Sequence, residues 1–311
     1  MDSREQPTSE LTEDELTIKK IQVPDPEYMS EIPQYMQNNL FPGFPSTTVI
    51  CGPPGRGKTN LLMNLLLNPK MWKGFFDKIY AYGPTVKCDK LYKTIKLQDD
   101  NVIDEVKAII PDLEKKLDEQ TKQVASNPNG APKILFLFED MTSFFNTVQH
   151  KPEFHRTYTQ IRHVKGSSIC MVHKYHAFNR TPRTSSQHII LFECNKKDID
   201  HVFEEFGPRS LDVNEFKEMV DYALTPTEKS PKPFFYINTL VPEETRYRKN
   251  FTEILKINPT YIPQTIKTKK RNRRKYERKE KTTISTGYGN QNESENEKDY
   301  GRGFRKRLRS Q

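Results

Sequence analysis

The sequence predicts an α/β fold in which helices cover a parallel β-sheet. Short apolar segments rich in β-branched and aromatic residues alternate along the chain with longer segments of helical pattern, which is typical of β-α-β units. One segment, Ile134–Phe138, is apolar at every position, as expected for a central strand that is buried on both faces of a parallel sheet.

The first strand is expected at Ser46–Cys51, where it leads directly into a loop rich in glycine and proline. The apolar stretch Leu61–Leu67 then predicts the first helix, which Asn68 and Pro69 end. The loop between them matches the P-loop pattern G-x-x-x-x-G-K-[ST] and consists of Gly52, Pro53, Pro54, Gly55, Arg56, Gly57, Lys58 and Thr59.

Strand, loop and helix are the context that a P-loop requires, so we expect this chain to bind ATP together with Mg²⁺. In such a loop, successive backbone N–H groups surround the phosphates and the helix N-terminus adds its dipole. The ammonium group of Lys58 reaches the β- and γ-phosphates, and the hydroxyl of Thr59 binds the metal ion.

The remaining elements follow the same alternation. Further strands are expected at residues 78–82, 134–138, 168–172, 188–192 and 234–237, and helices at residues 89–126, 153–165, 197–206 and 212–223. The second strand ends at Gly83-Pro84, and a polar loop, Ser126–Pro132, precedes the third. Together these elements predict a P-loop ATPase domain at residues 31–263.

The two ends of the chain differ from this domain in composition. Residues 1–30 are polar, charged and interrupted by proline, and residues 264–311 contain 16 Lys and Arg against 6 Asp and Glu. Because these compositions suit no packed core, both ends are expected to be disordered. The whole chain carries +9, so this C-terminal tail holds all the net positive charge. The tail predicts DNA binding or nuclear import through Lys269, Lys270, Arg271, Arg273, Arg274 and Lys275.

The cysteines and the hydropathy pattern limit the classes of protein. Cys51, Cys88, Cys170 and Cys194 form no C-x-x-C pair, so reduced thiols are expected rather than disulfides or a zinc site. The N-terminus is acidic and polar, and no apolar run approaches the ~18 residues of a membrane span. We therefore expect a soluble, intracellular protein that has no membrane partner.

An acidic pair, Glu139 and Asp140, follows the all-apolar strand. P-loop enzymes carry at this place the acidic residue that holds Mg²⁺. One carboxylate would hold the metal ion, and the other would polarise the water that attacks the γ-phosphate. By position we assign Glu139 to the metal ion, together with Thr59, and Asp140 to the water, with the opposite assignment left open.

Three more catalytic candidates lie at the same predicted edge of the sheet. His173 follows the strand at 168–172, where a polar side chain can sense the γ-phosphate. Arg183 lies in the next loop and could act as an arginine finger, in its own subunit or in a neighbour's. Arg180 is the second candidate for this role, and a solvated loop charge is the alternative for both.

Two short patterns compete with this interpretation. Asn195-Lys196-Lys197-Asp198 matches the N-K-x-D motif with which GTPases read guanine, but no D-x-x-G follows the acidic strand. The same four residues form a good helix start with Asn195 as N-cap. The histidines His173, His176 and His188 lack the cysteine or carboxylate neighbours of a zinc site, so we expect no metal there.

The order of these motifs resembles that of the genome-packaging ATPases of double-stranded DNA viruses and Polinton-type elements, in the FtsK–HerA superfamily. The resemblance covers roughly residues 46–240 and is strongest to the poxvirus-type enzymes. It is carried by the P-loop, by Glu139-Asp140 and by the stretch Val172–Phe192 with Arg183. The adenovirus packaging ATPase is similar too, with a histidine at the position of His173.

This resemblance implies a RecA-like sheet whose strands, numbered along the chain, have the order 5-1-4-3-2. It also implies a homo-oligomeric ring that uses ATP to drive double-stranded DNA into a preformed capsid, in contact with capsid or portal-vertex proteins. Lys165 and the basic tail could hold DNA phosphates without reading the sequence. The place of action would be the host nucleus, the virion or a viral factory.

Three other functions stay open on the residues alone. A helicase-like or segregation motor would share the core and differ in its partner. A small-molecule nucleotide kinase would need a mobile Arg-rich lid and a second substrate pocket. A nucleotide-gated binding protein without hydrolysis would leave Glu139 and Asp140 without a role.

Overall fold

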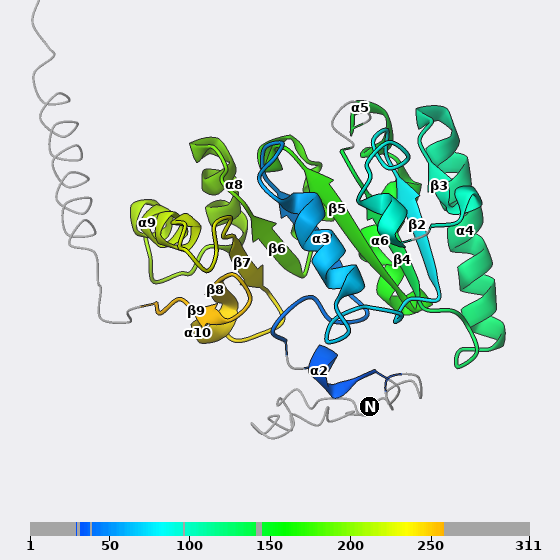
Figure 1. Cartoon of the computed structure of the whole chain (residues 1–311), viewed down its shortest axis with the longest axis horizontal. Coiled ribbons are helices and arrows are strands. Elements are labelled where there is room, and N and C mark those ends of the chain that lie inside the picture. Colours follow the sequence, from blue (N-terminus) through cyan, green and yellow to red (C-terminus); the bar gives the residue numbers. More distant parts are fainter. Residues whose placement is uncertain (1–28, 30–31, 38, 96, 141–144, 258–311) are drawn as a thin grey trace, which may run out of the picture. The chain divides into compact units, whose positions relative to one another are not determined.

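A sheet of nine strands forms the centre of the described part of the chain (Figure 1). The computed structural model describes residues 29, 32–37, 39–95, 97–140 and 145–257. All of them belong to one unit, Met1–Tyr261, and the second unit, Ile262–Gln311, falls outside the described residues. The strands are β1 (Thr47–Cys51), β2 (Lys78–Tyr82), β3 (Val102–Ile103), β4 (Ile134–Phe138), β5 (Gly166–Val172), β6 (His188–Leu191), β7 (Phe235–Asn238), β8 (Tyr247–Lys249) and β9 (Glu253–Ile254).

The strands lie in the order β3-β2-β4-β5-β1-β6-β7-β8-β9. Neighbours from β3 to β6 are parallel, which confirms the predicted α/β fold with a parallel central sheet. The predicted last strand is present as β7, but it is antiparallel to β6, as are β8 and β9 to their neighbours. Two consecutive helices separate β6 from β7 and return the chain to the edge from which it left, so β7 enters the sheet in the opposite direction.

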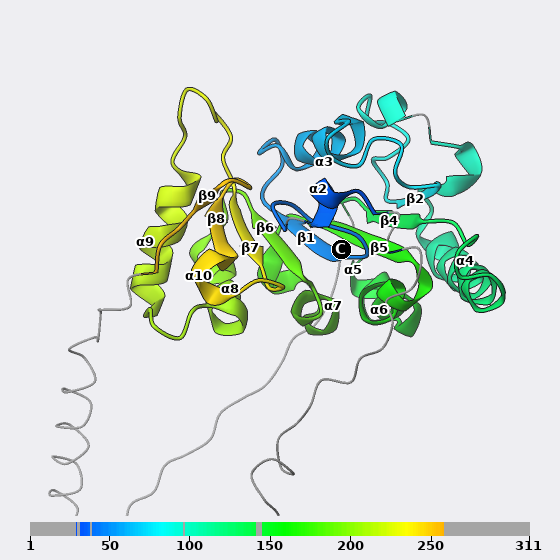
Figure 2. The same ribbon diagram turned by 90° about the horizontal axis from the view of Figure 1, so that it is seen from below.

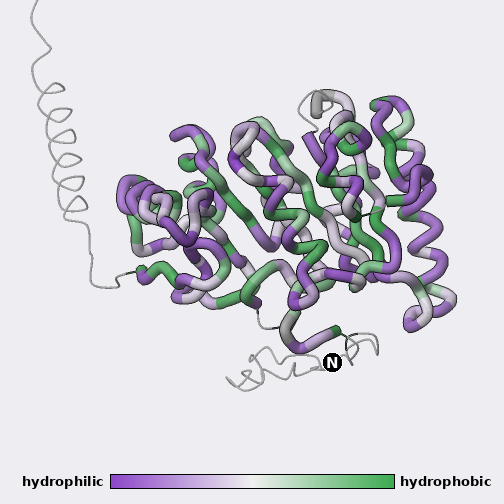
Figure 3. The backbone as a smooth tube through the Cα atoms, viewed as in Figure 1, coloured by the Kyte–Doolittle hydropathy of each residue, from purple (hydrophilic) through white to green (hydrophobic). Residues whose placement is uncertain are grey.

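Helices cover both faces of the sheet, which Figure 2 shows from below. Residues of α3 pack with the aromatic side chains of Phe41, Phe44 and Trp72 on one face, whereas α4, α6, α8 and α9 pack on the other. Figure 3 shows hydrophobic residues along the central strands and hydrophilic residues along much of α4. The helices are α2 (Gln34–Gln37), α3 (Lys58–Leu67), α4 (Val106–Ser126), α5 (Phe145–Val148), α6 (Pro152–Thr159), α7 (Arg180–Thr184), α8 (Lys196–Phe206), α9 (Val213–Leu224) and α10 (Glu243–Arg246).

The predicted helices are present with two differences. The helix expected at 89–126 begins only at Val106, and two short 3₁₀ helices, Tyr92–Ile95 and Asp99–Asn101, precede it together with β3. Aspartate and asparagine side chains compete for backbone hydrogen bonds, which favours turns over a continuous helix here. The helix expected at 153–165 ends at Thr159 and continues as a 3₁₀ turn.

The register of the parallel strands gathers their carboxyl ends at one edge of the sheet. Cys51 at the end of β1 is opposite Val172 of β5 and Leu191 of β6, and Phe138 of β4 is opposite Cys170. The residues that follow these strands therefore lie at this edge, which is where open α/β sheets bind their ligands.

No helix among the described residues is long and apolar enough to cross a membrane. The ends predicted to be disordered, 1–30 and 264–311, lie outside the described residues except for Met29. The basic residues proposed for DNA binding or import lie there as well, so their role and the domain limits stay predictions.

Candidate active site

The P-loop connects β1 to α3 and has the backbone shape that its glycines allow. Gly57 caps α3 with a φ of 111°, and Gly55 has a φ of 75°, both in the left-handed region that favours glycine. A Cβ atom at Gly52 would lie 2.7 Å from Cβ of Phe192, so the loop also needs glycine there to pass close to the end of β6.

Lys58 points back into this loop. Its ammonium group donates hydrogen bonds to the carbonyl oxygens of Gly52 (2.6 Å) and Pro53 (3.2 Å). Burial lowers the pKa of Lys58, and the nearby Cys51, Asp140 and Glu139 oppose this shift. Phosphate oxygens are stronger acceptors for an ammonium group than carbonyls, so Lys58 can exchange these two contacts for an anion bound in the loop.

Thr59 and Glu139 join the P-loop helix to the acidic strand. The Thr59 hydroxyl donates a hydrogen bond to Oε1 of Glu139 over 2.8 Å. The other oxygen, Oε2, is buried and makes no hydrogen bond of standard geometry to a described residue, although the Tyr92 hydroxyl lies near the carboxylate. Burial raises the pKa of Glu139, and Tyr92 and Thr59 oppose this shift. A hydroxyl beside a buried carboxylate with an unused oxygen fits the hard oxygen ligands that Mg²⁺ prefers.

The backbone of Glu139 is held by the neighbouring strand. Its N–H donates to the carbonyl of Tyr82 over 2.8 Å. Gly83, which has a φ of 148°, packs against Glu139 so closely that a Cβ atom would overlap the Glu139 carbonyl oxygen. In the sequence Gly83 indicated only the end of a strand, and the structure shows that it also positions the acidic residue.

Asp140 and His173 form the second part of the site. Asp140 has a φ of 44°, and its Oδ1 lies 3.4 Å from Nδ1 of His173. Both side chains are partly exposed, unlike that of Glu139. Burial and the charge of Lys58 lower the pKa of His173, while Asp140 opposes the shift. An imidazole beside a solvent-accessible carboxylate is therefore present at the edge where a γ-phosphate sensor was predicted, and the sensing role itself stays a prediction.

Arg183 does not lie where an arginine finger would need it. Its side chain is buried, and its Nε and Nη2 donate to Oε1 of Glu205 over 2.9 and 2.6 Å. Its Nη1 donates to three backbone carbonyls of the preceding loop, those of Tyr175, His176 and Phe178. The proposed finger role of Arg183 is therefore corrected: its hydrogen bonds fasten the loop to α8. Arg180, on the same short helix α7, is exposed and keeps the finger role as a proposal.

We expect Arg183→Ala to destabilise the fold by about 3 kcal/mol or more, because it leaves Glu205 and the loop carbonyls without their partner. The measurement is the free energy of unfolding by denaturant. Arg180→Ala is the matched control on the same helix, and we expect it to change this free energy by less than about 0.5 kcal/mol. Equal stability of the two variants would contradict the structural role of Arg183.

Other competing interpretations are also decided by side-chain placement. Asn195 caps α8 through a bond from the Asp198 N–H to its side chain, which confirms the helix-start interpretation of N-K-x-D. Asp198 is buried and hydrogen-bonded to His176, so it cannot pair with a base.

Two further basic side chains lie away from the site edge. His188 lies at the opposite end of β6, where burial lowers its pKa to about 3. Lys165 is buried and donates to loop carbonyls, so it is not the DNA contact that was expected.

The site can now be compared with known proteins. The model of the family described as "Poxvirus A32 protein" matches residues 34–222, which is more than half of the chain. The chain belongs to this family. The membership confirms the predicted resemblance to poxvirus-type ATPases, and the matched range contains the P-loop, the acidic pair and α7.

Several solved structures are similar to this A32-family chain. The genome packaging NTPase B204 from Sulfolobus turreted icosahedral virus 2, in complex with ATP-gammaS, is 13% identical over 68% of this chain and 98% of that chain, with a TM-score of 0.43. The DNA-packaging ATPase B204 from Sulfolobus turreted icosahedral virus is 11% identical over the same shares, with a TM-score of 0.48. EssC (ATPases 2 and 3) from Geobacillus thermodenitrificans is 11% identical over 79% of this chain and 46% of that chain, with a TM-score of 0.44. A comparison with curated proteins gave no match.

One residue at the P-loop was not found from the sequence. Lys232 lies in the segment between α9 and β7, and its ammonium group donates to the carbonyl of Gly55 over 2.8 Å. A Cβ atom at Gly57 would lie 3.5 Å from Cδ of Lys232, so this side chain covers the loop. Gly55 and Lys232 are 177 positions apart in the chain. A solvated lysine in a polar segment carries no local sequence signal for such a contact.

We expect Lys232→Ala to weaken binding of Mg-ATP about three- to tenfold, because an exposed cation beside the phosphate loop contributes one charge-assisted contact. Titration with a fluorescent ATP analogue measures the dissociation constant. Lys229→Ala, which removes an exposed lysine of the same segment, is the matched control and should leave the constant unchanged. Identical constants for both variants would show that Lys232 has no contact with the nucleotide.

Proposed function

We propose that this A32-family chain is an ATP-driven motor that packages double-stranded DNA into a viral capsid. The observation that carries the proposal is the bond between Thr59 and Glu139, which joins the P-loop to the acidic strand within the range of the family match. Such a junction is what phosphoryl transfer needs: a phosphate cradle and a metal site at one edge of a rigid sheet.

The residues divide the chemistry between them. Lys58 and the N–H groups of the P-loop hold the β- and γ-phosphates, and Thr59 and Glu139 would hold Mg²⁺. The metal ion, when bound, neutralises charge that develops on the phosphate oxygens. Asp140, the more exposed carboxylate, would polarise the attacking water, with His173 beside it to report the γ-phosphate. The contact of Glu139 with Thr59 supports this assignment over the opposite one.

Hydrolysis in a ring would require a group from the neighbouring subunit. Arg180 is our candidate for this group, because it is exposed on α7, in the segment that connects β5 to β6. Mixing Arg180→Ala with Lys58→Ala should restore part of the turnover, since some interfaces then contain an intact P-loop and an intact arginine. Turnover of the mixture no higher than that of either variant would argue against action in trans.

The coupling to DNA is tested by the turnover of the full chain with and without linear double-stranded DNA. We expect stimulation by DNA that decreases steeply with added salt, because phosphate contacts release counterions. If the tail binds DNA, deletion of residues 264–311 should make the salt dependence of the stimulation shallower. If the tail directs nuclear import, the deletion should leave the salt dependence unchanged and alter only the cellular localisation of a tagged protein.

Turnover that is indifferent to DNA, together with phosphate transfer to AMP, would replace the motor by a nucleotide kinase. DNA stimulation without any association with capsid or portal-vertex proteins would favour a helicase-like or segregation motor. Packaging further implies a place of action at the site of virion assembly, in the nucleus or in a viral factory.

A further inference from the structure

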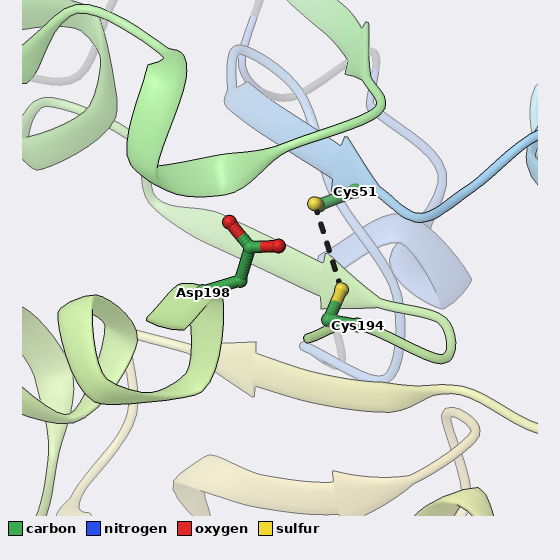
Figure 4. A group of neighbouring side chains, drawn as sticks. All are labelled: Cys51, Cys194 and Asp198. Carbon is green, nitrogen blue, oxygen red and sulfur yellow. Dashed lines mark hydrogen bonds between the residues drawn. The ribbon is translucent and has the colours of Figure 1, made fainter. Parts of the chain in front are cut away.

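Three side chains with metal-ligand chemistry meet directly behind the P-loop (Figure 4). Cys51 is the last residue of β1 and precedes Gly52, Cys194 follows β6, and Asp198 lies in the first turn of α8. The two sulfur atoms are 3.6 Å apart, and all three ligand atoms lie within 4.8 Å of one another. In Figure 4 the Asp198 carboxylate faces the two sulfur atoms.

These separations are close to those of a tetrahedral zinc site. With Zn–S bonds near 2.3 Å and Zn–O bonds near 2.0 Å, two thiolates lie about 3.8 Å apart, and a thiolate and a carboxylate oxygen about 3.5 Å apart. The sulfur pair, at 3.6 Å, is close to this spacing, and the carboxylate needs a movement of about 1.3 Å at most. Three protein ligands leave a fourth position for water, as in open zinc sites.

The surroundings hold the carboxylate in place. Oδ1 of Asp198 accepts hydrogen bonds from the backbone N–H of His176 (2.9 Å) and from its Nδ1 (2.7 Å). The side chain of Asp198 is only 1% exposed. Ligating carboxylates are commonly fixed by such outer hydrogen bonds, which orient the remaining oxygen toward the ion.

Access and charge also suit a divalent ion. Cys51 is fully buried, but Cys194 is partly exposed and gives the ion a way in. Two neutral thiols and one carboxylate have a net charge of −1. When a divalent ion replaces the two thiol protons, the net charge of the site stays −1, so the electrostatic environment of the nearby Lys58 is unchanged. Burial raises the pKa of Cys51, so we expect the affinity for metal to increase with pH.

We propose that Cys51, Cys194 and Asp198 form a zinc-binding site that joins the ends of β1 and β6 to the start of α8. His176 acts as a positioning residue for Asp198 and does not touch the ion. The proposal is independent of the motor function, since it concerns metal binding and the stability of the fold. The expectation of no zinc rested on sequence spacing, and the two cysteines are 143 residues apart.

The test uses the full chain, kept reduced with a phosphine and freed of metal. Titration with Co²⁺ should produce a thiolate-to-metal charge-transfer band that saturates at one ion per chain and disappears when Zn²⁺ is added. Zn²⁺ should also raise the midpoint of thermal unfolding, because it binds only the folded state tightly. Both signals are independent of ATP hydrolysis.

Variants at all four cysteines separate the site from other thiols. Cys194→Ser and Cys51→Ser should lose the band, whereas Cys88→Ser and Cys170→Ser should keep it. If Cys51→Ser does not fold, the band of Cys194→Ser alone tests the site, because Cys194 is partly exposed and its replacement disturbs the core less. His176→Ala should weaken binding about tenfold or more. A band that is absent from the wild-type chain or survives in Cys194→Ser would overturn the proposal. So would a Cys51–Cys194 pair that forms a disulfide without reductant but takes up no metal when reduced.

Discussion

Lys58→Ala should lower the turnover of ATP by about 10³-fold or more, because Lys58 supplies the charge that meets the β- and γ-phosphates. The structure gives a reason to expect that the fold survives. Its two hydrogen bonds go only to carbonyls of its own loop, those of Gly52 and Pro53.

The measurement combines steady-state turnover with a thermal melt. Lys70→Ala is the control, since Lys70 is an exposed lysine just beyond the same helix. A Lys58→Ala chain that melts normally and hydrolyses ATP at the wild-type rate would refute the assignment of the P-loop. A chain that no longer melts cooperatively would instead show that the lysine is needed for the loop to fold, and Lys58→Met would then repeat the test with the aliphatic stem retained.

The second large effect is expected at the acidic pair, where Glu139→Gln and Asp140→Asn should each lower turnover about 10²- to 10⁴-fold. The two changes should differ in binding. Glu139→Gln replaces the carboxylate bonded to Thr59 and should weaken Mg²⁺-dependent binding of ATP, whereas Asp140→Asn should leave binding intact.

Both variants keep size and shape, so the comparison isolates charge. The dissociation constant for ATP, measured with and without Mg²⁺, distinguishes the roles. Retention of Mg²⁺-dependent binding in Glu139→Gln and its loss in Asp140→Asn would reverse the assignment. Wild-type turnover in both variants would exclude β4 as the acidic strand.

The parts of the site that local sequence determines were predictable. Strand, glycine-rich loop and apolar helix are consecutive in the chain, and the structure has β1, the P-loop and α3 in that order. The all-apolar strand before Glu139 identified a central strand, and parallel strands place their following residues at one edge. These rules were enough to bring Lys58, Glu139, Asp140 and His173 together before the structure was known.

Contacts between distant segments were not predictable. The buried position of Arg183 depends on its ion pair with Glu205. Glu205 belongs to α8, which follows β6 in the sequence, whereas Arg183 precedes β6. The contact of Lys232 with Gly55 joins the segment before β7 to the P-loop, and β7 runs antiparallel to β6, a direction that the sequence did not indicate. A single sequence carries periodicity and local signals, but it does not show which polar side chains meet after folding.

The bonds of Arg183 have a mechanical consequence. The loop that begins at His173 is held near Asp140 at one end and, through Arg183, to Glu205 of α8 at the other. Since three carbonyls of this loop share one guanidinium, the loop cannot change shape without losing several hydrogen bonds together. We therefore expect the loop and α8 to move as one rigid body, so that a displacement of His173 at the phosphate end is carried to the outer surface of α8.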